Sequence, residues 1–157
     1  DYRTSTNTWC DQACEQDGHT QNVIQKIHHL TGGTIPFFPH SEPFQLLKYT
    51  EGQLYDRHHD YIHAEQNSPQ GPRILTIFLY LNTVEEGGET EFTSLNITVT
   101  PQQGRAVVWP NVLNQHPTDI DRRTFHKAHP VVKGTKYGAN VWLHLRDNRT
   151  PAAHGCA

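Results

Sequence analysis

The sequence of 157 residues contains no methionine, only three cysteines and no long hydrophobic run. Its longest apolar stretch, residues 74–81, is eight residues long and includes a threonine, whereas a membrane-spanning helix needs about 20 apolar residues. Charge is nearly balanced, because 13 basic residues stand against 16 acidic residues and no run of lysine and arginine occurs. We therefore expect neither a membrane contact nor a nucleic-acid partner for this segment.

Cysteine is too scarce for a disulfide framework or a thiolate zinc site. Cys10, Cys14 and Cys156 allow at most one intrachain disulfide, and the sequence leaves open which two of them pair. The chain has no Cys-x-x-Cys pair of the kind that binds zinc. Because it begins at Asp1 and lacks methionine, we expect it to be part of a longer protein whose N-terminal part is missing.

The hydrophobic pattern changes from a helical to a strand-like period along the chain. Val23, Ile27 and Leu30 have the spacing of one helix face, which Gly32 and Gly33 terminate. After residue 43, short apolar runs alternate with turn residues. The expected strands are residues 44–50, 55–62, 73–82, 89–92, 97–100, 105–109, 129–132 and 136–145. This order predicts a single, mainly β domain over residues 1–157, with a closed or double-sheet antiparallel architecture such as a jelly roll.

Histidine is unusually abundant, with 12 residues, and imidazole is the commonest metal ligand in proteins. In the expected strand 55–62, His58 and Asp60 would point to one face and His59 to the other. Two such ligands and a nitrogen from a distant strand would form a 2-His-1-carboxylate triad. That triad leaves coordination positions open and suits non-haem Fe(II) oxygenases.

Four further segments accompany the His-x-Asp motif in a fixed order. With the motif itself, they are residues 49–60 (YTEGQLYDRHHD), 73–82 (RILTIFLYLN), 84–90 (VEEGGET), 125–131 (FHKAHPV) and 133–144 (KGTKYGANVWLH). His126 follows His58 by 68 residues, and Lys136 follows His126 by ten. In these segments the chain resembles the prolyl 4-hydroxylase family of Fe(II)- and 2-oxoglutarate-dependent dioxygenases, from Arg3 to about His144.

The resemblance implies a mainly β fold, a double-stranded β-helix (jelly roll) with one or two N-terminal helices packed on it, and three groups of site residues. The Fe(II) ligands would be His58, Asp60 and His126. The residues that bind 2-oxoglutarate would be Lys136, which pairs with the distal carboxylate, and the hydrogen-bond donors Tyr49 and Thr90. The residues on the peptide side of the site would be Tyr55, Arg73 and Trp142. The implied reaction converts peptidyl proline to 4-hydroxyproline with O2 and 2-oxoglutarate, releases succinate and CO2, and is supported by ascorbate.

Two positions depart from the family pattern. His129 stands where the family often has cysteine, and Tyr137 stands where it often has tryptophan. Since His129 is three residues after His126, the two side chains would point to opposite faces of one strand, so we expect His126 to be the ligand. Lysine at position 136, where the hypoxia-sensing prolyl hydroxylases use arginine, points to the collagen-type and plant or algal branch.

Two alternatives remain open from the sequence. One is an oxygenase of the same type that acts on another substrate; the other is a cupin-like metal-binding module without turnover, which would have no use for Lys136. A proline-containing peptide is the expected partner, with residues 67–71 and 111–121 as candidate substrate loops. The family resemblance and the glycosylation sequons at Asn96 and Asn148 favour the lumen of the endoplasmic reticulum or Golgi, with oligomeric state undetermined.

Overall fold

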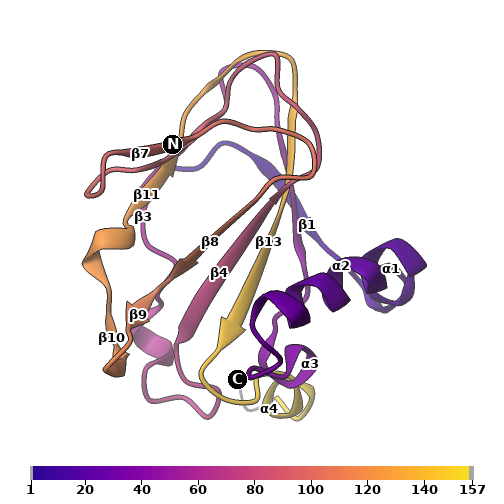
Figure 1. Cartoon of the computed structure of the whole chain (residues 1–157), viewed down its shortest axis with the longest axis vertical. Helices are drawn as coiled ribbons and strands as arrows, with labels where there is room; N and C mark the ends of the chain where they lie inside the picture. Colours follow the sequence, from indigo (N-terminus) through magenta and orange to yellow (C-terminus); the bar gives the residue numbers. More distant parts are fainter. Residues whose placement is uncertain (1, 156–157) are drawn as a thin grey trace.

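The computed structural model describes residues 2–155, which form two facing antiparallel sheets with helices on one side (Figure 1). The helices are α1 (Gln12–Gln16), α2 (Gly18–Leu30), α3 (Phe37–His40) and α4 (Arg149–Ala153), with short 3-10 helices η1 (His63–Glu65) and η2 (Arg122–Thr124). The first strands are β1 (Thr6–Trp9), β2 (Gln45–Tyr49), β3 (Tyr55–His58), β4 (Arg73–Tyr80), β5 (Glu86–Gly87), β6 (Thr90–Phe92) and β7 (Ile97–Val99). The later strands are β8 (Ala106–Pro110), β9 (Val112–Leu113), β10 (His116–Ile120), β11 (His126–Ala128), β12 (Val131–Lys133) and β13 (Lys136–His144).

Two main sheets confirm the predicted mainly β architecture. The larger sheet has the order β1-β2-β13-β4-β8, and the smaller has the order β3-β11-β6-β7. All pairings within them are antiparallel. Strands distant in sequence, such as β2, β13 and β4, therefore lie side by side, as a double-stranded β-helix requires.

Strand β13 separates two apolar cores, because its successive side chains point to opposite faces of the sheet. Val141 and Leu143 pack with Ile24 and Ile27 of α2 in a core outside the barrel. A second core, between the sheets, contains Phe78, Tyr80, Phe92 and Trp109 among others. The central strands β4 and β13 are therefore buried on both faces, which explains why β4 is almost continuously apolar in sequence.

The N-terminal helices cover the outer face of the larger sheet (Figure 1). Helix α2 begins after Asp17, whose side chain accepts a hydrogen bond from the backbone N–H of His19. Its buried face includes Ile24 and Ile27, but Leu30 is 60 % exposed, so the predicted helix face ends one turn early. The C-terminal helix α4 was not predicted, and no described helix is long and apolar enough to cross a bilayer.

The structure settles the disulfide that the sequence left open. Cys10 and Cys14 are bonded to each other at the junction of β1 and α1, where Asp11 caps the helix by accepting from the N–H of Cys14. Cys156 lies outside the described residues. The disulfide therefore fixes the turn through which the edge strand β1 enters the helical layer.

Three predicted segments differ from the observed structure near the pocket. The strand expected over 55–62 ends at His58, so Asp60 lies in a bend and not in a strand. Residues 111–121, expected as a loop, contain the two-stranded β9–β10 hairpin. Strand β11, which carries His126, was not predicted and has only three residues, since it lies between η2 and a proline.

Candidate active site

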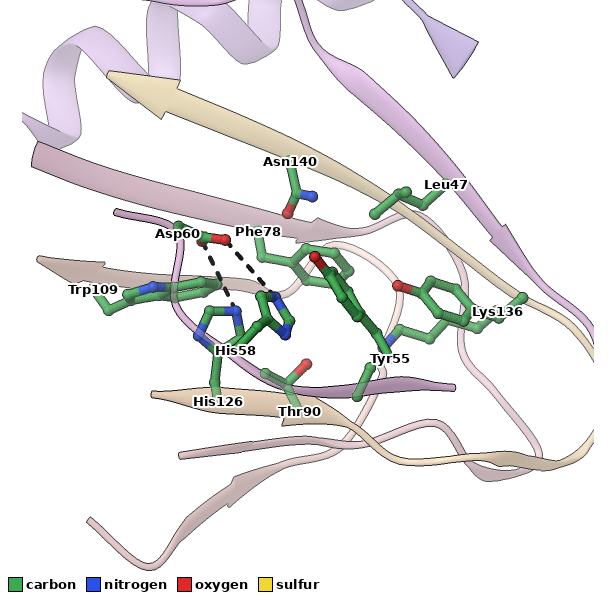
Figure 2. A pocket seen from close by; sticks show the side chains of 12 residues that line it. Leu47, Tyr55, His58, Asp60, Phe78, Thr90, Trp109, His126, Lys136 and Asn140 are labelled. Atoms are coloured by element: carbon green, nitrogen blue, oxygen red, sulfur yellow. Dashed lines mark ion pairs between the residues drawn. The ribbon is translucent and has the colours of Figure 1, made fainter. Parts of the chain in front are cut away.

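Three potential metal ligands converge between the two sheets. His58 ends β3 and His126 begins β11, and these two residues are direct partners in the antiparallel ladder. The Nε2 atoms of both imidazoles lie 3.8 Å from the carboxylate of Asp60, each nearest a different oxygen (Figure 2). All three side chains are buried, and their ligand atoms lie within 4.8 Å of one another. Two imidazoles and one carboxylate are the donor set of a facial triad.

Backbone carbonyls orient both imidazoles toward Asp60. Nδ1–H of His58 donates to the carbonyl of Asp56 at 2.7 Å, and Nδ1–H of His126 donates to the carbonyl of Thr124 at 3.0 Å. This leaves both Nε2 atoms unprotonated and facing the pocket, as in metal sites where an outer partner fixes the ligand tautomer. The cluster is therefore preorganised for a cation.

Asp60 is held by hydrogen bonds that start on another strand. The Thr76 hydroxyl of β4 donates to Asp60 Oδ2 at 2.8 Å, and the amide of Asn111 donates to Thr76 Oγ1 at 2.8 Å. All three residues are buried. Thr76 and Asn111 were not predicted as site residues, although a threonine that interrupts the apolar run 74–81 was a visible signal for Thr76.

Electrostatics favour the deprotonated state of His58 and of Asp60. Burial and the neighbouring His126 lower the pKa of His58 to about 4. Burial alone would raise the pKa of Asp60, but His126, His58, Arg73 and the Thr76 hydroxyl together lower it. Neutral imidazole and charged carboxylate are the forms that bind a metal.

Aromatic rings enclose the imidazoles. Tyr55 stacks on His58 with ring centroids 3.6 Å apart, and Trp109 lies edge-on to His126 with centroids 4.7 Å apart. Phe78 lines the same pocket from β4, and a side chain at Gly138 on the adjacent strand would clash with its ring at 2.5 Å. The rings restrict water access and hold the ligands in one orientation.

Lys136 lies at the other end of this pocket (Figure 2). Its side chain is 1 % exposed, and Nζ donates to the carbonyl of Gly88 at 2.7 Å. Gly88 has a φ of +72°, a left-handed conformation that suits glycine and turns its carbonyl toward the lysine. No carboxylate among residues 2–155 forms an ion pair with Lys136. Burial accordingly lowers its pKa to about 7.

Tyr49 and Thr90, the hydrogen-bond donors that the family resemblance implies, line the same pocket as Lys136 and the imidazoles. Both are buried, and burial raises the pKa of Tyr49. The hydroxyl of Tyr80 donates to Thr90 Oγ1 at 2.7 Å, so the Thr90 proton is free to be directed elsewhere. Asn140, which was not predicted, lines the pocket from β13.

Of the three residues expected on the peptide side, only Tyr55 lines the pocket that contains the imidazoles. Arg73 stacks on the Trp142 ring at 3.8 Å, and its guanidinium pairs with Glu42 through two hydrogen bonds. His144 Nε2–H donates to the same carboxylate at 2.8 Å. These residues form a largely buried cluster beside the site, in which Glu42 and His144 were not predicted.

The two other histidines of the motifs point away from the triad. His59 Nε2–H donates to the carbonyl of Asp121 at 2.9 Å, and its Nδ1 accepts from the backbone N–H of Tyr61. His129 lies just beyond β11 and contacts Glu91 at 2.6 Å. Both side chains therefore lie outside the cluster of potential ligands in the described residues, and His59 does so just beyond the end of β3 and not within a strand.

Comparison with known proteins agrees with this geometry. Residues 44–144 match the model of the 2OG-Fe(II) oxygenase superfamily. The chain is 32 % identical to prolyl 4-hydroxylase subunit alpha-2 of Gallus gallus over 94 % of its length, and 34 % identical to probable prolyl 4-hydroxylase 9 of Arabidopsis thaliana over 92 %. Those alignments cover 27 % and 54 % of the two relatives, so the chain spans about half or less of their length.

A solved structure shares both the fold and part of the sequence. The viral collagen prolyl hydroxylase of Paramecium bursaria Chlorella virus-1, in its 2OG complex, superposes with a TM-score of 0.74 and is 28 % identical. The match covers 91 % of this chain and 80 % of the viral one. Both the sequence match and the buried His-Asp-His cluster assign this chain to the 2OG-Fe(II) oxygenase superfamily.

Proposed function

We propose that this chain is the catalytic domain of an Fe(II)- and 2-oxoglutarate-dependent dioxygenase that hydroxylates proline in peptides. The single observation that carries the proposal is one pocket with the His-Asp-His cluster at one end and an unbalanced buried lysine at the other. A metal site alone would also fit a binding module. A buried cation next to it calls for an anionic ligand, since an unpaired buried charge is costly.

In this proposal His58, Asp60 and His126 hold Fe(II) through the two Nε2 atoms and a carboxylate oxygen. The iron, with O2 and 2-oxoglutarate, supplies the oxidising chemistry that inserts oxygen into a C–H bond. Three protein ligands leave coordination positions open for these cosubstrates. Thr76 keeps Asp60 in place, so that its carboxylate does not need to reorganise when the metal binds.

Lys136 would pair with the distal carboxylate of 2-oxoglutarate. Its ammonium group is already desolvated and is oriented by the carbonyl of Gly88. Binding of the anion therefore does not require the lysine side chain to be ordered or desolvated. Tyr49 and Thr90 would donate hydrogen bonds to the same molecule from the pocket wall.

Tyr55, Arg73 and Trp142 remain proposed for the peptide side of the site. The ring of Tyr55 stacks on His58, whereas Arg73 and Trp142 would act from the adjacent cluster. The relatives' names support peptidyl proline as substrate, and ascorbate is proposed as the reductant that keeps iron ferrous.

The proposal is tested by incubating the chain with Fe(II), 2-oxoglutarate, ascorbate and proline-rich peptides. Succinate is measured alongside peptide mass, and we expect one added oxygen per succinate with the oxygen located on proline. Peptide-independent succinate release alone would indicate an oxygenase for another substrate. No release under any condition would indicate a metal-binding module.

We also propose that the chain resides in the lumen of the secretory pathway. The Cys10–Cys14 disulfide suits an oxidising compartment, and Asn96 is exposed in the turn between β6 and β7. Asn148 of the second sequon is only 9 % exposed, which makes Asn96 the better glycan acceptor. Expression in secretory cells followed by glycosidase digestion should shift the mass of the wild type and leave Asn96→Gln unchanged.

A further inference from the structure

A second cavity, which we call the Gln70 cavity, lies at the end of β13 away from Lys136. Its volume is about 280 Å³. Its lining includes Trp9, Glu42, Glu65, Gln70, His144 and Asn148. Asn140, Trp142 and His144 are every second residue of β13, so their side chains point to the same, inner face of the sheet. At about 3.3 Å per residue, His144 lies about 13 Å beyond Asn140 along the strand. The cavity therefore lies on the side of the candidate site opposite the proposed cosubstrate.

Two acceptors in this cavity lack a donor among the described residues. Gln70 is 3 % exposed, and its Oε1 has no hydrogen-bond partner. Oε2 of Glu65, at the end of η1, is also buried without a partner. Buried polar atoms are normally satisfied, so two acceptors at one cavity indicate a missing donor.

The charges around the cavity indicate that this donor is a cation. Glu42 is balanced by Arg73, whereas Glu65 forms no ion pair within residues 2–155. Burial raises the pKa of Glu65 although Arg73 and His144 lower it, so these neighbours compensate the charge of the Glu65 carboxylate only in part. The indole of Trp9, 47 % exposed, adds an aromatic face that favours a cation.

We propose that the Gln70 cavity is a specificity subsite that binds a basic side chain, lysine or arginine, of the peptide substrate. The N–H groups of that side chain donate to Gln70 Oε1 and to the Glu65 carboxylate, while its aliphatic part lies against Trp9. The inference rests on the proposed function, because the peptide must approach the metal cluster from the end that Lys136 does not occupy. It also gives a role to residues 67–71, the candidate substrate loop that contains Gln70.

Binding can be tested without turnover. The chain is loaded with Zn(II) and 2-oxoglutarate and titrated with proline peptides that carry lysine at one of the three positions before or after the proline. Matched peptides carry norleucine, which keeps most of the aliphatic chain and removes the ammonium group. The Gln70 side-chain amide and Trp9 indole signals are followed by NMR, and the dissociation constant is measured for each peptide.

We expect lysine at one position to tighten binding about tenfold over norleucine, the size of a charge-assisted hydrogen bond, and to shift both signals. Glu65→Gln should remove most of that preference and Gln70→Met part of it. Glu86→Gln, at an exposed carboxylate outside the cavity, should leave the preference unchanged.

Equal affinity for lysine and norleucine at every position would overturn the proposal, as would a lysine preference that survives Glu65→Gln or no peptide binding at all. Hydroxylation of the norleucine peptides by the Fe(II) form separates this failure from failure of the proposed function. A lysine preference in binding without hydroxylation of any peptide would keep the subsite and remove the prolyl hydroxylase activity.

Discussion

Among the described residues, the buried Lys136 and the largely buried Arg73 are two cations near opposite ends of β13, and their surroundings are opposite. Lys136 has a carbonyl and aromatic rings around it but no ion-pair partner among the described residues. Arg73 has a carboxylate, Glu42, on two of its nitrogens and the Trp142 ring on its face. We call Lys136 an open charge, because no described carboxylate pairs with it, and Arg73 a closed charge, because Glu42 pairs with it.

The pKa values of the two cations are shifted in opposite directions, as their different surroundings require. Burial lowers the pKa of Lys136 to about 7, so folding of the ligand-free chain pays part of the cost of binding an anion. For Arg73, burial alone would lower the pKa, but Glu42 outweighs it and raises the pKa. An open buried charge therefore indicates a ligand, and a closed one indicates a role in positioning the chain.

The largest expected effect is loss of the metal from the cluster between these two ends. Alanine at His58, Asp60 or His126 should each reduce bound Fe(II) from about one per chain to background and abolish activity, because a facial triad cannot lose a ligand. Metal content after anaerobic loading and gel filtration measures this.

His59→Ala and His129→Ala are the matched controls, since both side chains point away from the cluster. Both should retain iron and substantial activity. If His59→Ala loses iron while His58→Ala retains it, the assignment of the ligands is wrong.

The next largest effect concerns the open charge. Lys136→Ala should raise the concentration of 2-oxoglutarate needed for half-maximal rate by about two to three decades, because breaking a buried pair costs about 3–5 kcal/mol. Lys136→Arg should also be impaired, as a planar guanidinium does not replace a compact ammonium. Fe(II) affinity, measured separately, should change little. Superimposable 2-oxoglutarate curves for wild type and Lys136→Ala would contradict the assignment.

A smaller effect is expected from the hydrogen bonds between the two ends. Thr76→Val removes the hydroxyl that donates to Asp60 and keeps the side-chain shape, so metal affinity should fall by about 10–100-fold. Thr98→Val, on the exposed strand β7, serves as the control. Unchanged Fe(II) affinity in Thr76→Val would show that Asp60 is positioned without this bond.

The pH dependence gives an effect of about tenfold per pH unit. In the ligand-free chain Lys136 is protonated below a pKa of about 7, and the anion pairs with the protonated form. Affinity for 2-oxoglutarate should therefore be nearly constant below pH 7. Above pH 7 it should weaken until the pH exceeds the higher pKa that Lys136 has when it is paired with the bound anion. Calorimetric titration from pH 6 to 9 tests this, with Lys136→Met expected to remove the dependence assigned to this residue.

The features that could be predicted from the sequence are those that leave a pattern among residues close together in the chain or a recognisable motif spacing. The alternation in β13 and the apolar β4 follow from strand periodicity, and His58, Asp60, His126 and Lys136 follow from motif spacing. The buried disposition of all four is confirmed by the structure, while their catalytic roles stay predictions.

Features set by contacts distant in the chain could not be predicted. Asn111 reaches Thr76 across 35 positions, and His144 reaches Glu42 across 102, so neither partnership leaves a local signal. Leu30 fits a helix face by spacing, yet it is 60 % exposed, because it lines a surface pocket with Leu79 and Leu81 that no other element fills among the described residues. The bend at Asp60 likewise depends on Thr76, because the carboxylate turns toward a hydroxyl on another strand.

The smallest effect on ligand binding is expected at the closed charge, and it provides the sharpest contrast with Lys136. Glu42→Gln breaks the ion pair of Arg73 and leaves only the more distant carboxylates of Asp60 and Glu65 facing it, and removing one partner of a buried pair costs about 3–5 kcal/mol of stability. Although burial alone would raise the pKa of Glu42, its bonds to His144 and Arg73 lower it, so this stability should also be lost as pH falls through the lowered pKa.

Affinities for Fe(II) and 2-oxoglutarate should change by less than about fivefold, or about 1 kcal/mol, because Glu42 does not line the pocket that contains the His-Asp-His cluster and Lys136. Thermal unfolding and both titrations on Glu42→Gln and Lys136→Ala decide the matter. If Glu42→Gln weakens 2-oxoglutarate as much as Lys136→Ala does, while unfolding at the wild-type temperature, the distinction between an open and a closed end is wrong.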